Sequence, residues 1–217
     1  MRIRSQAFTF PEFLFVICIL AVASAVVLVP ALRKAKGRSS RIGCANNLKQ
    51  VSFAFKQWSL DNTDRYPMQV SVTNGGTMEL VEQGKVFPHF LVMSNELNTP
   101  RILLCPDDNE RTNAYTFDTS LNDRQISYFV GVDAEDIKPQ MLLVGDAHFA
   151  IGGKRLKPGL VRLGTSSPVG WPKPIPKSHD NGGNIGLADG SVINCDDKGI
   201  RELLRRSGNP TNRLAIP

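Results

Sequence analysis

The sequence predicts an α+β fold in which one long N-terminal helix precedes a small antiparallel β-sheet domain. Residues 13–32 form an uncharged apolar run, and residues 45–58 repeat apolar side chains at spacings of three and four. From residue 101 to residue 194, short segments rich in Val, Ile and Leu alternate with Gly, Pro, Asn and Asp. The first two patterns are typical of helices, and the third is typical of short strands joined by turns.

The apolar run from Phe13 to Leu32 has the length and composition of a membrane-spanning helix. Thirteen of its twenty residues are Leu, Ile, Val or Phe, and none is charged. At about 1.5 Å per residue it reaches roughly 30 Å, the thickness of a hydrocarbon core. The alternative is a secretory signal peptide cut near Ala23-Ser24-Ala25. We disfavour that alternative because the apolar run is longer than in such peptides and continues beyond the site.

The residues ahead of this run, Arg4-Ser5-Gln6-Ala7-Phe8-Thr9-Phe10-Pro11-Glu12, resemble the cleavage and methylation signal of type IV pilins and type II secretion pseudopilins. The resemblance implies that a prepilin peptidase cuts between Ala7 and Phe8, that the Phe8 amine is methylated, and that Glu12 is the acid used in assembly. Ala7 stands where the family usually has Gly. The resemblance also implies a pilin-like organisation: a leader (1–7), a transmembrane helix (8–32), its continuation (33–60) and a β-rich head (61–217).

Glu12 has a physical reason to stand at this position. A carboxylate in hydrocarbon is stabilised by pairing with a cation, and the Phe8 amine of the same or a neighbouring subunit is the nearest candidate after cleavage. Pro11 falls in the first helical turn, where its missing N–H costs nothing. The alternative interpretation is an acid that only marks the membrane interface.

The net charge of +6 belongs to the anchor and its flanks. Residues 42–217 hold nineteen basic and nineteen acidic residues, so the head lacks the overall positive charge of a nucleic-acid binder. Five cations follow the apolar run and two precede it, and the positive-inside rule would therefore keep the head in the cytoplasm. The pilin resemblance implies the opposite orientation, and we follow the resemblance. The basic residues after the run can contact anionic lipid headgroups.

Beyond the membrane, one buried helical stripe continues to about residue 60. Its members are Ala45, Leu48, Val51, Phe55 and Trp58. The expected strands of the head are 101–105, 126–132, 140–145, 184–188 and 191–194. Asp189-Gly190 predicts a hairpin turn between the last two strands. A short helix is expected over 198–206 with a cap at Asp196 or Asp197, and 165–177 is expected to be an irregular loop.

Several head segments resemble blocks of a pseudopilin-like group typical of Verrucomicrobia and related bacteria. The segments are Cys44–Gln50, Leu104–Asp108, Ile126–Gly131, Leu142–Asp146 and His179–Val192. In the last block, His179 stands ten residues before Asp189-Gly190, the spacing from which such heads are named. The resemblance does not supply a role for His179, Asp189 or Gly190.

Four cysteines need an assignment. Cys18 lies in the apolar run and is expected to act as a small apolar residue. Cys44 and Cys105 are the pair that we expect to form a disulfide, which would close a loop of about sixty residues and contribute about 4 kcal/mol in the chain-entropy model. Free buried thiols are the alternative, since three exported cysteines cannot all pair within one chain. Cys195 is left over.

An enzyme is the least favoured interpretation of the head. Asp146, His148, His179 and Asp189 include a carboxylate and an imidazole two residues apart and could hold a divalent metal. Turns and strand ends explain most of these residues more simply, because Asx side chains bind backbone amides there. We therefore expect no catalytic residue, no metal and no cofactor. A structural calcium ion in the Asp- and Asn-rich loops is kept as an alternative.

These observations predict a non-enzymatic pseudopilin of the inner membrane, with a single span and a periplasmic head. Its partners would be the prepilin peptidase, other pseudopilin subunits and membrane lipid, with no nucleic acid. The filament would be a type II secretion pseudopilus or a type IV pilus-like fibre. The alternative is a solitary membrane-anchored binding or sensor protein that does not polymerise.

Overall fold

The structure is a computed structural model that describes residues 10–172 and 182–217. The chain forms two compact units, Met1–Ser39 and Ser40–Pro217. The helix α1 (Phe10–Asp61) contributes to both units. The second unit, which we call the head from here on, therefore includes the last part of this helix, whereas the sequence predicts a head that begins at residue 61.

In the first unit, α1 exposes apolar side chains around its whole circumference. Phe15, Val22 and Val27 are 68%, 65% and 70% exposed. The helix continues through Pro30, although a proline inside a helix removes one backbone hydrogen bond. Within the described residues, α1 is the helix long and apolar enough to cross a membrane, and its most apolar window is entirely unburied.

In the head, the expected helical stripe forms one side of the core. Leu48, Val51 and Phe55 are fully buried and Trp58 is almost so, which confirms the predicted face. The stripe starts with the fully buried Cys44, while Ala45 beside it is half-buried. The helix thus presents a thiol, as well as apolar groups, to the sheet.

Within the described part of the chain, six strands form one antiparallel sheet in the order β5-β9-β1-β2-β7-β8. Their bounds are β1 (Tyr128–Gly131), β2 (Leu142–Asp146), β5 (Gly159–Gly164), β7 (Gly183–Leu187), β8 (Val192–Cys195) and β9 (Thr211–Ile216). The expected α+β class with an antiparallel sheet is confirmed. A smaller sheet holds β3 (Ala150–Ile151), β4 (Lys154–Arg155) and β6 (Val169–Gly170).

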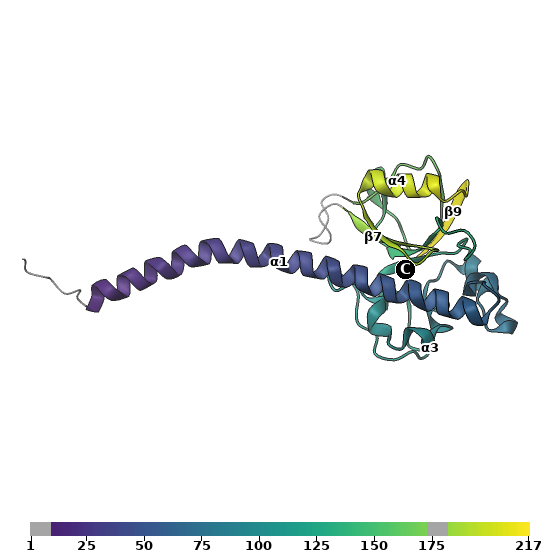
Figure 1. Ribbon diagram of the computed structural model, residues 1–217, viewed down its shortest axis with the longest axis horizontal. Coiled ribbons are helices and arrows are strands. Elements are labelled where there is room, and N and C mark those ends of the chain that lie inside the picture. Colours follow the sequence, from purple (N-terminus) through teal and green to yellow (C-terminus); the bar gives the residue numbers. More distant parts are fainter. Residues whose placement is uncertain (1–9, 173–181) are drawn as a thin grey trace, which may run out of the picture. The chain divides into compact units, whose positions relative to one another are not determined.

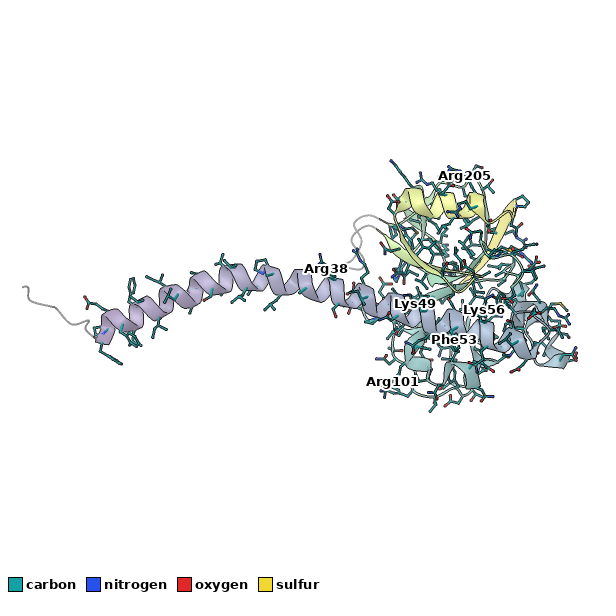
Figure 2. All side chains as sticks on the ribbon, viewed as in Figure 1. Arg38, Lys49, Phe53, Lys56, Arg101 and Arg205 are labelled. Carbon is teal, nitrogen blue, oxygen red and sulfur yellow. The ribbon has the colours of Figure 1, made fainter. Side chains whose placement is uncertain are left out.

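The two faces of the sheet bury separate cores. On one face, Tyr128 and Val130 of β1 join the core that contains the α1 stripe. On the other face, Phe129 joins the core beneath α4 (Asp197–Arg206), so β1 alternates with the period expected of a strand. Figure 1 shows α4 over one face of the sheet, and in Figure 2 side chains fill the space between them.

A register shift in β2 decides which way its last residues point. Leu142 belongs to the α4 side, but Leu143 and Val144 both belong to the α1 side, and the pairing with β7 shifts between Leu142 and Val144. Such a bulge adds one residue and reverses the alternation. Asp146, two residues after Val144, therefore lies on the α1 face opposite its register partner Tyr128.

The sequence located most central strands and the last helix. β1, β2, β7, β8 and α4 fall within two residues of their expected bounds, and Asp196 caps α4 by accepting hydrogen bonds from the amides of Lys198 and Gly199. Gly190 has φ +84° in the β7–β8 turn, as the Asp-Gly signal predicts.

Three expectations for the head need correction. The predicted strand 101–105 is wrong: Pro100–Leu103 form a 3-10 helix, η4, because Pro100 starts the turn and the Thr99 side chain accepts a hydrogen bond from the Arg101 amide. The loop expected over 165–177 contains β6, and its residues 173–177 lie outside the described residues. The edge strand β5 and the inner strand β9 were not expected.

The other helices of the described chain are short. They are η1 (Pro67–Gln69), η2 (Val72–Asn74), η3 (Met78–Gln83), α2 (Phe87–Leu91), α3 (Ser94–Leu97) and η5 (Asp123–Gln125).

Candidate functional site

A cluster of polar side chains lies buried between α1 and the sheet. Cys44 comes from α1, Cys105 follows η4, and Asp146 ends β2. These three residues are 0%, 3% and 3% exposed, and their ligand-type atoms all lie within 4.8 Å of one another. Three elements distant in sequence therefore converge on one small polar volume in an otherwise apolar core.

Hydrogen bonds fix the atoms of this cluster. The Cys44 thiol donates to Asp146 Oδ1 at 3.0 Å, and the Cys44 sulfur lies 3.5 Å from the hydroxyl oxygen of the fully buried Tyr128. The other carboxylate oxygen, Asp146 Oδ2, accepts from the Asn184 backbone N–H at 2.7 Å and from Asn184 Nδ2 at 3.2 Å. Both oxygens of the buried carboxylate are thus engaged.

A second layer holds these groups in place. Asn194 Nδ2 donates to Asn184 Oδ1 at 3.1 Å, so β8 orients the amide that orients Asp146. The Cys105 amide donates to Ser127 Oγ at 3.0 Å, and Ser127 Oγ donates to Asp108 Oδ2 at 2.8 Å. Buried polar networks that are satisfied in this way favour one arrangement of the core.

Burial favours the neutral forms of the Cys44 thiol and the Tyr128 hydroxyl. Desolvation raises the pKa of the Cys44 thiol well above its usual value, and hydrogen bonding to Cys105 and the charge of Asp146 add to the shift. Desolvation likewise raises the pKa of Tyr128, with the nearby Cys44 and Asp146 as further causes. A thiol with a raised pKa is a poor nucleophile.

Comparison with protein-family models, with curated proteins and with solved structures finds no match for this chain.

The processing residues expected from the sequence lie at or beyond the edge of the described chain. Ala7 and Phe8 fall outside the described residues. Glu12 lies in the first turn of α1, directly after Pro11, which is where the sequence analysis expects both residues. The predicted roles of Ala7, Phe8 and Glu12 stay predictions.

Of the suggested metal set of Asp146, His148, His179 and Asp189, the described residues Asp146 and Asp189 lie apart. Asp189 is exposed in the β7–β8 turn, where its Oδ1 accepts from the Ser191 amide and its own amide donates to Pro139 O near the start of β2. Asp146 lies at the opposite end of β2. His179 is outside the described residues. Asp189 and Gly190 therefore serve the hairpin turn, as their Asx-Gly chemistry predicts.

The expected Cys44–Cys105 disulfide involves two neighbouring residues. Both are thiols in the structure, as are Cys18 and Cys195, and the pairing stays a prediction. Burial raises the pKa of Cys195 to about 12.

The third member of the cluster, Asp146, was missed as a partner of the cysteines. The available signals were the position of Cys44 on the buried face of α1 and the carboxylate that directly follows an apolar strand. Their convergence depends on the bulge in β2, and Gly145, directly after the shifted residues Leu143 and Val144, is the local signal that could have indicated it.

The head also has a surface pocket of about 870 Å3. Its charged lining residues are the basic Arg111, Arg124, Arg155 and Lys157 and the acidic Glu110 and Asp123. Asp123 Oδ1 accepts hydrogen bonds from the amides of Val86 and Phe87. The volume falls within the range of small-molecule sites.

Proposed function

We propose that this chain is a membrane-anchored pseudopilin, a non-enzymatic subunit that joins a type II secretion pseudopilus or a type IV pilus-like filament after its leader is removed. The observation that carries the proposal is that the two parts of α1 differ in which side chains they expose and bury. Its first part exposes apolar side chains around the helix, and its part from Ser40 onward forms one wall of the head core.

In this proposal, the first part of this helix lies in the membrane. Val26 and Val27 are 69% and 70% exposed, and the single acid of the segment, Glu12, lies in its first turn. Such a surface is unfavourable in water because about 25 cal/mol is lost per Å2 of exposed apolar area. In this proposal the apolar surface lies in the inner membrane before assembly and against neighbouring subunits afterwards.

Glu12 guides assembly in this proposal. After the cut between Ala7 and Phe8, the amine of Phe8 is the cation that pairs with the Glu12 carboxylate of a neighbouring subunit. The pair offsets the cost of burying both charges only where its geometry is good and the remaining hydrogen-bonding groups are satisfied. The prepilin peptidase, other pseudopilin subunits and lipid are the partners, and the head lies in the periplasm.

The test is the substitution Glu12→Ala in the native membrane, with Glu202→Ala on α4 as the matched control. Glu202 is an exposed acid whose side chain pairs with Arg205. We expect the Glu12 variant to insert normally and to be lost from sheared filaments, because only its pairing charge is removed, while the Glu202 variant assembles normally. Normal incorporation of the Glu12 variant would refute the proposed pairing.

The surface pocket favours a second candidate function, a solitary anchored binding protein. A pocket of about 870 Å3 lined by four basic and two acidic side chains suits a small acidic ligand better than a filament contact. Cross-linking in the native membrane separates the two functions. A pseudopilin gives ladders of linked copies through α1, whereas a solitary binding protein gives a monomer.

A further inference from the structure

The cluster of Cys44, Cys105 and Asp146 has the composition of a metal site. Thiolate sulfur and carboxylate oxygen are ligands of zinc, and tetrahedral bond lengths put the ligand atoms about 3.5 to 3.8 Å from one another. The three candidate atoms lie within 4.8 Å of one another, and two of them are already 3.0 Å apart. We propose that these residues bind a thiophilic divalent cation, for which zinc is the reference ion.

The surroundings of Asp146 match those of a metal-binding carboxylate. Metal ligands are held by outer hydrogen bonds that leave the binding atom directed at the ion. Asn184 supplies two such bonds to Oδ2, and Asn194 orients Asn184 in turn. Oδ1 is the oxygen that faces Cys44, and it becomes the ligand when the Cys44 thiol loses its proton.

Cys105 is also held at its backbone. Its amide donates to Ser127 Oγ at 3.0 Å, and its carbonyl accepts from the Asp108 amide at 2.9 Å. The backbone of Cys105 is therefore held from both sides. Its sulfur can reach an ion shared with α1 with little movement of the chain. A bound ion would tie α1 to both the η4 turn and the sheet.

Charge balance is compatible with the buried setting. Binding of one divalent ion releases one proton from each thiol to solvent, so that two thiolates and one carboxylate surround two positive charges. The Tyr128 hydroxyl, 3.5 Å from the Cys44 sulfur, can donate to the resulting thiolate. Hydrogen bonds to a charged sulfur stabilise the one negative charge that is left over.

A disulfide and a bound cation would use these groups differently. A disulfide would use the two sulfurs and remove the thiol proton that Asp146 Oδ1 now accepts. A cation uses all three groups and gives the carboxylate a direct positive partner. The site does not depend on filament assembly, so it stands or falls separately from the proposed function.

The experiment uses the full chain purified in detergent under reducing conditions, loaded with zinc and dialysed. We expect one zinc per chain, protection of two thiols from alkylation, and a sulfur-to-cobalt charge-transfer band after replacement of zinc by Co2+. Cys44→Ser and Asp146→Asn should remove the band. Asn184→Ala should lower zinc affinity by about 10- to 100-fold, as loss of an outer hydrogen bond does elsewhere.

The matched control is Cys195→Ser, which removes another buried thiol outside the cluster and should leave zinc binding unchanged. Asp146→Asn keeps the shape of the side chain, so a far-ultraviolet spectrum like that of the parent shows that lost binding is not lost folding. Reactive thiols and no bound metal after zinc loading would overturn the proposal. A Cys44–Cys105 disulfide in protein isolated without reductant, seen by peptide mass, would also overturn it and would support the pairing expected from the sequence.

Discussion

The close approach of α1 to the sheet depends on the glycine at position 186. A Cβ atom added there would lie 2.6 Å from Ser52 Oγ and 3.0 Å from Val144 Cγ1. Both distances are shorter than an ordinary van der Waals contact, and both neighbours are buried. Overpacking of this kind costs about 1 to 3 kcal/mol. Gly186→Ala should therefore lower the free energy of unfolding of the head by that amount.

Ser52 Oγ is the nearest atom in the predicted clash with a Cβ at position 186. Its Oγ is buried and has no hydrogen-bond partner among the described residues, so Ser52→Ala alone should be neutral or stabilising. In the double variant with Gly186→Ala, the nearest clashing atom is gone, and we expect at least half of the lost stability to return. Residues in direct contact commonly show a coupling of about 0.5 to 3 kcal/mol.

The assay is urea unfolding of the full chain in detergent, followed by tryptophan fluorescence. Gly164→Ala is the control, because a Cβ there meets its nearest atoms only at 3.8 Å in a strand of the same sheet. That variant should stay within about 0.5 kcal/mol of the parent. A Gly186→Ala variant as stable as the parent, or costs that simply add in the double variant, would refute the close-packing argument.

Three further predictions concern the head. Phe55→Ala should cost about 3 to 5 kcal/mol because the ring is fully buried against Tyr66 and Phe90, whereas Phe53→Ala, 67% exposed on the same helix (Figure 2), should change urea stability little. Burial lowers the pKa of His89 to about 4, so the unfolded chain takes up its proton first as the pH falls, and stability should drop by roughly 3 kcal/mol from pH 6.5 to pH 4. His89→Gln should lack this component, and an unchanged pH profile in that variant would contradict it. Asp196→Ala should cost about 1 kcal/mol by removing the α4 cap, measured as a lower urea midpoint, and no change would show that the cap is dispensable.

The sequence is sufficient for elements whose signals are local. The buried face of α1 follows from apolar residues three and four apart. The β7–β8 hairpin follows from Asp189-Gly190, because the turn needs a residue with positive φ and Gly190 provides it. The cap of α4 at Asp196 is local for the same reason. These features need no knowledge of the rest of the chain.

Features that depend on distant pairing could not be predicted in this way. β9 pairs with β5 and β1. Ser207-Gly208 and Asn209-Pro210 mark a turn after α4, but the short segment that follows lacks the β-branched alternation typical of a strand. In the other direction, the apolar residues after Pro100 imitate a strand, although the proline and the Thr99 cap favour a 3-10 turn. The cysteine and aspartate cluster depends on the bulge in β2, which turns Asp146 toward α1.

The central claim concerns processing and orientation at the N-terminus, and the mass of the N-terminal peptide from the native membrane tests it most directly. The account predicts a peptide that begins at Phe8 and carries a methyl group on its amine. In the proposed function, cleavage there would place residues 1–7 on the cytoplasmic side and the head on the other. A peptide that retains Met1, or one that begins after Ala25, would contradict the account.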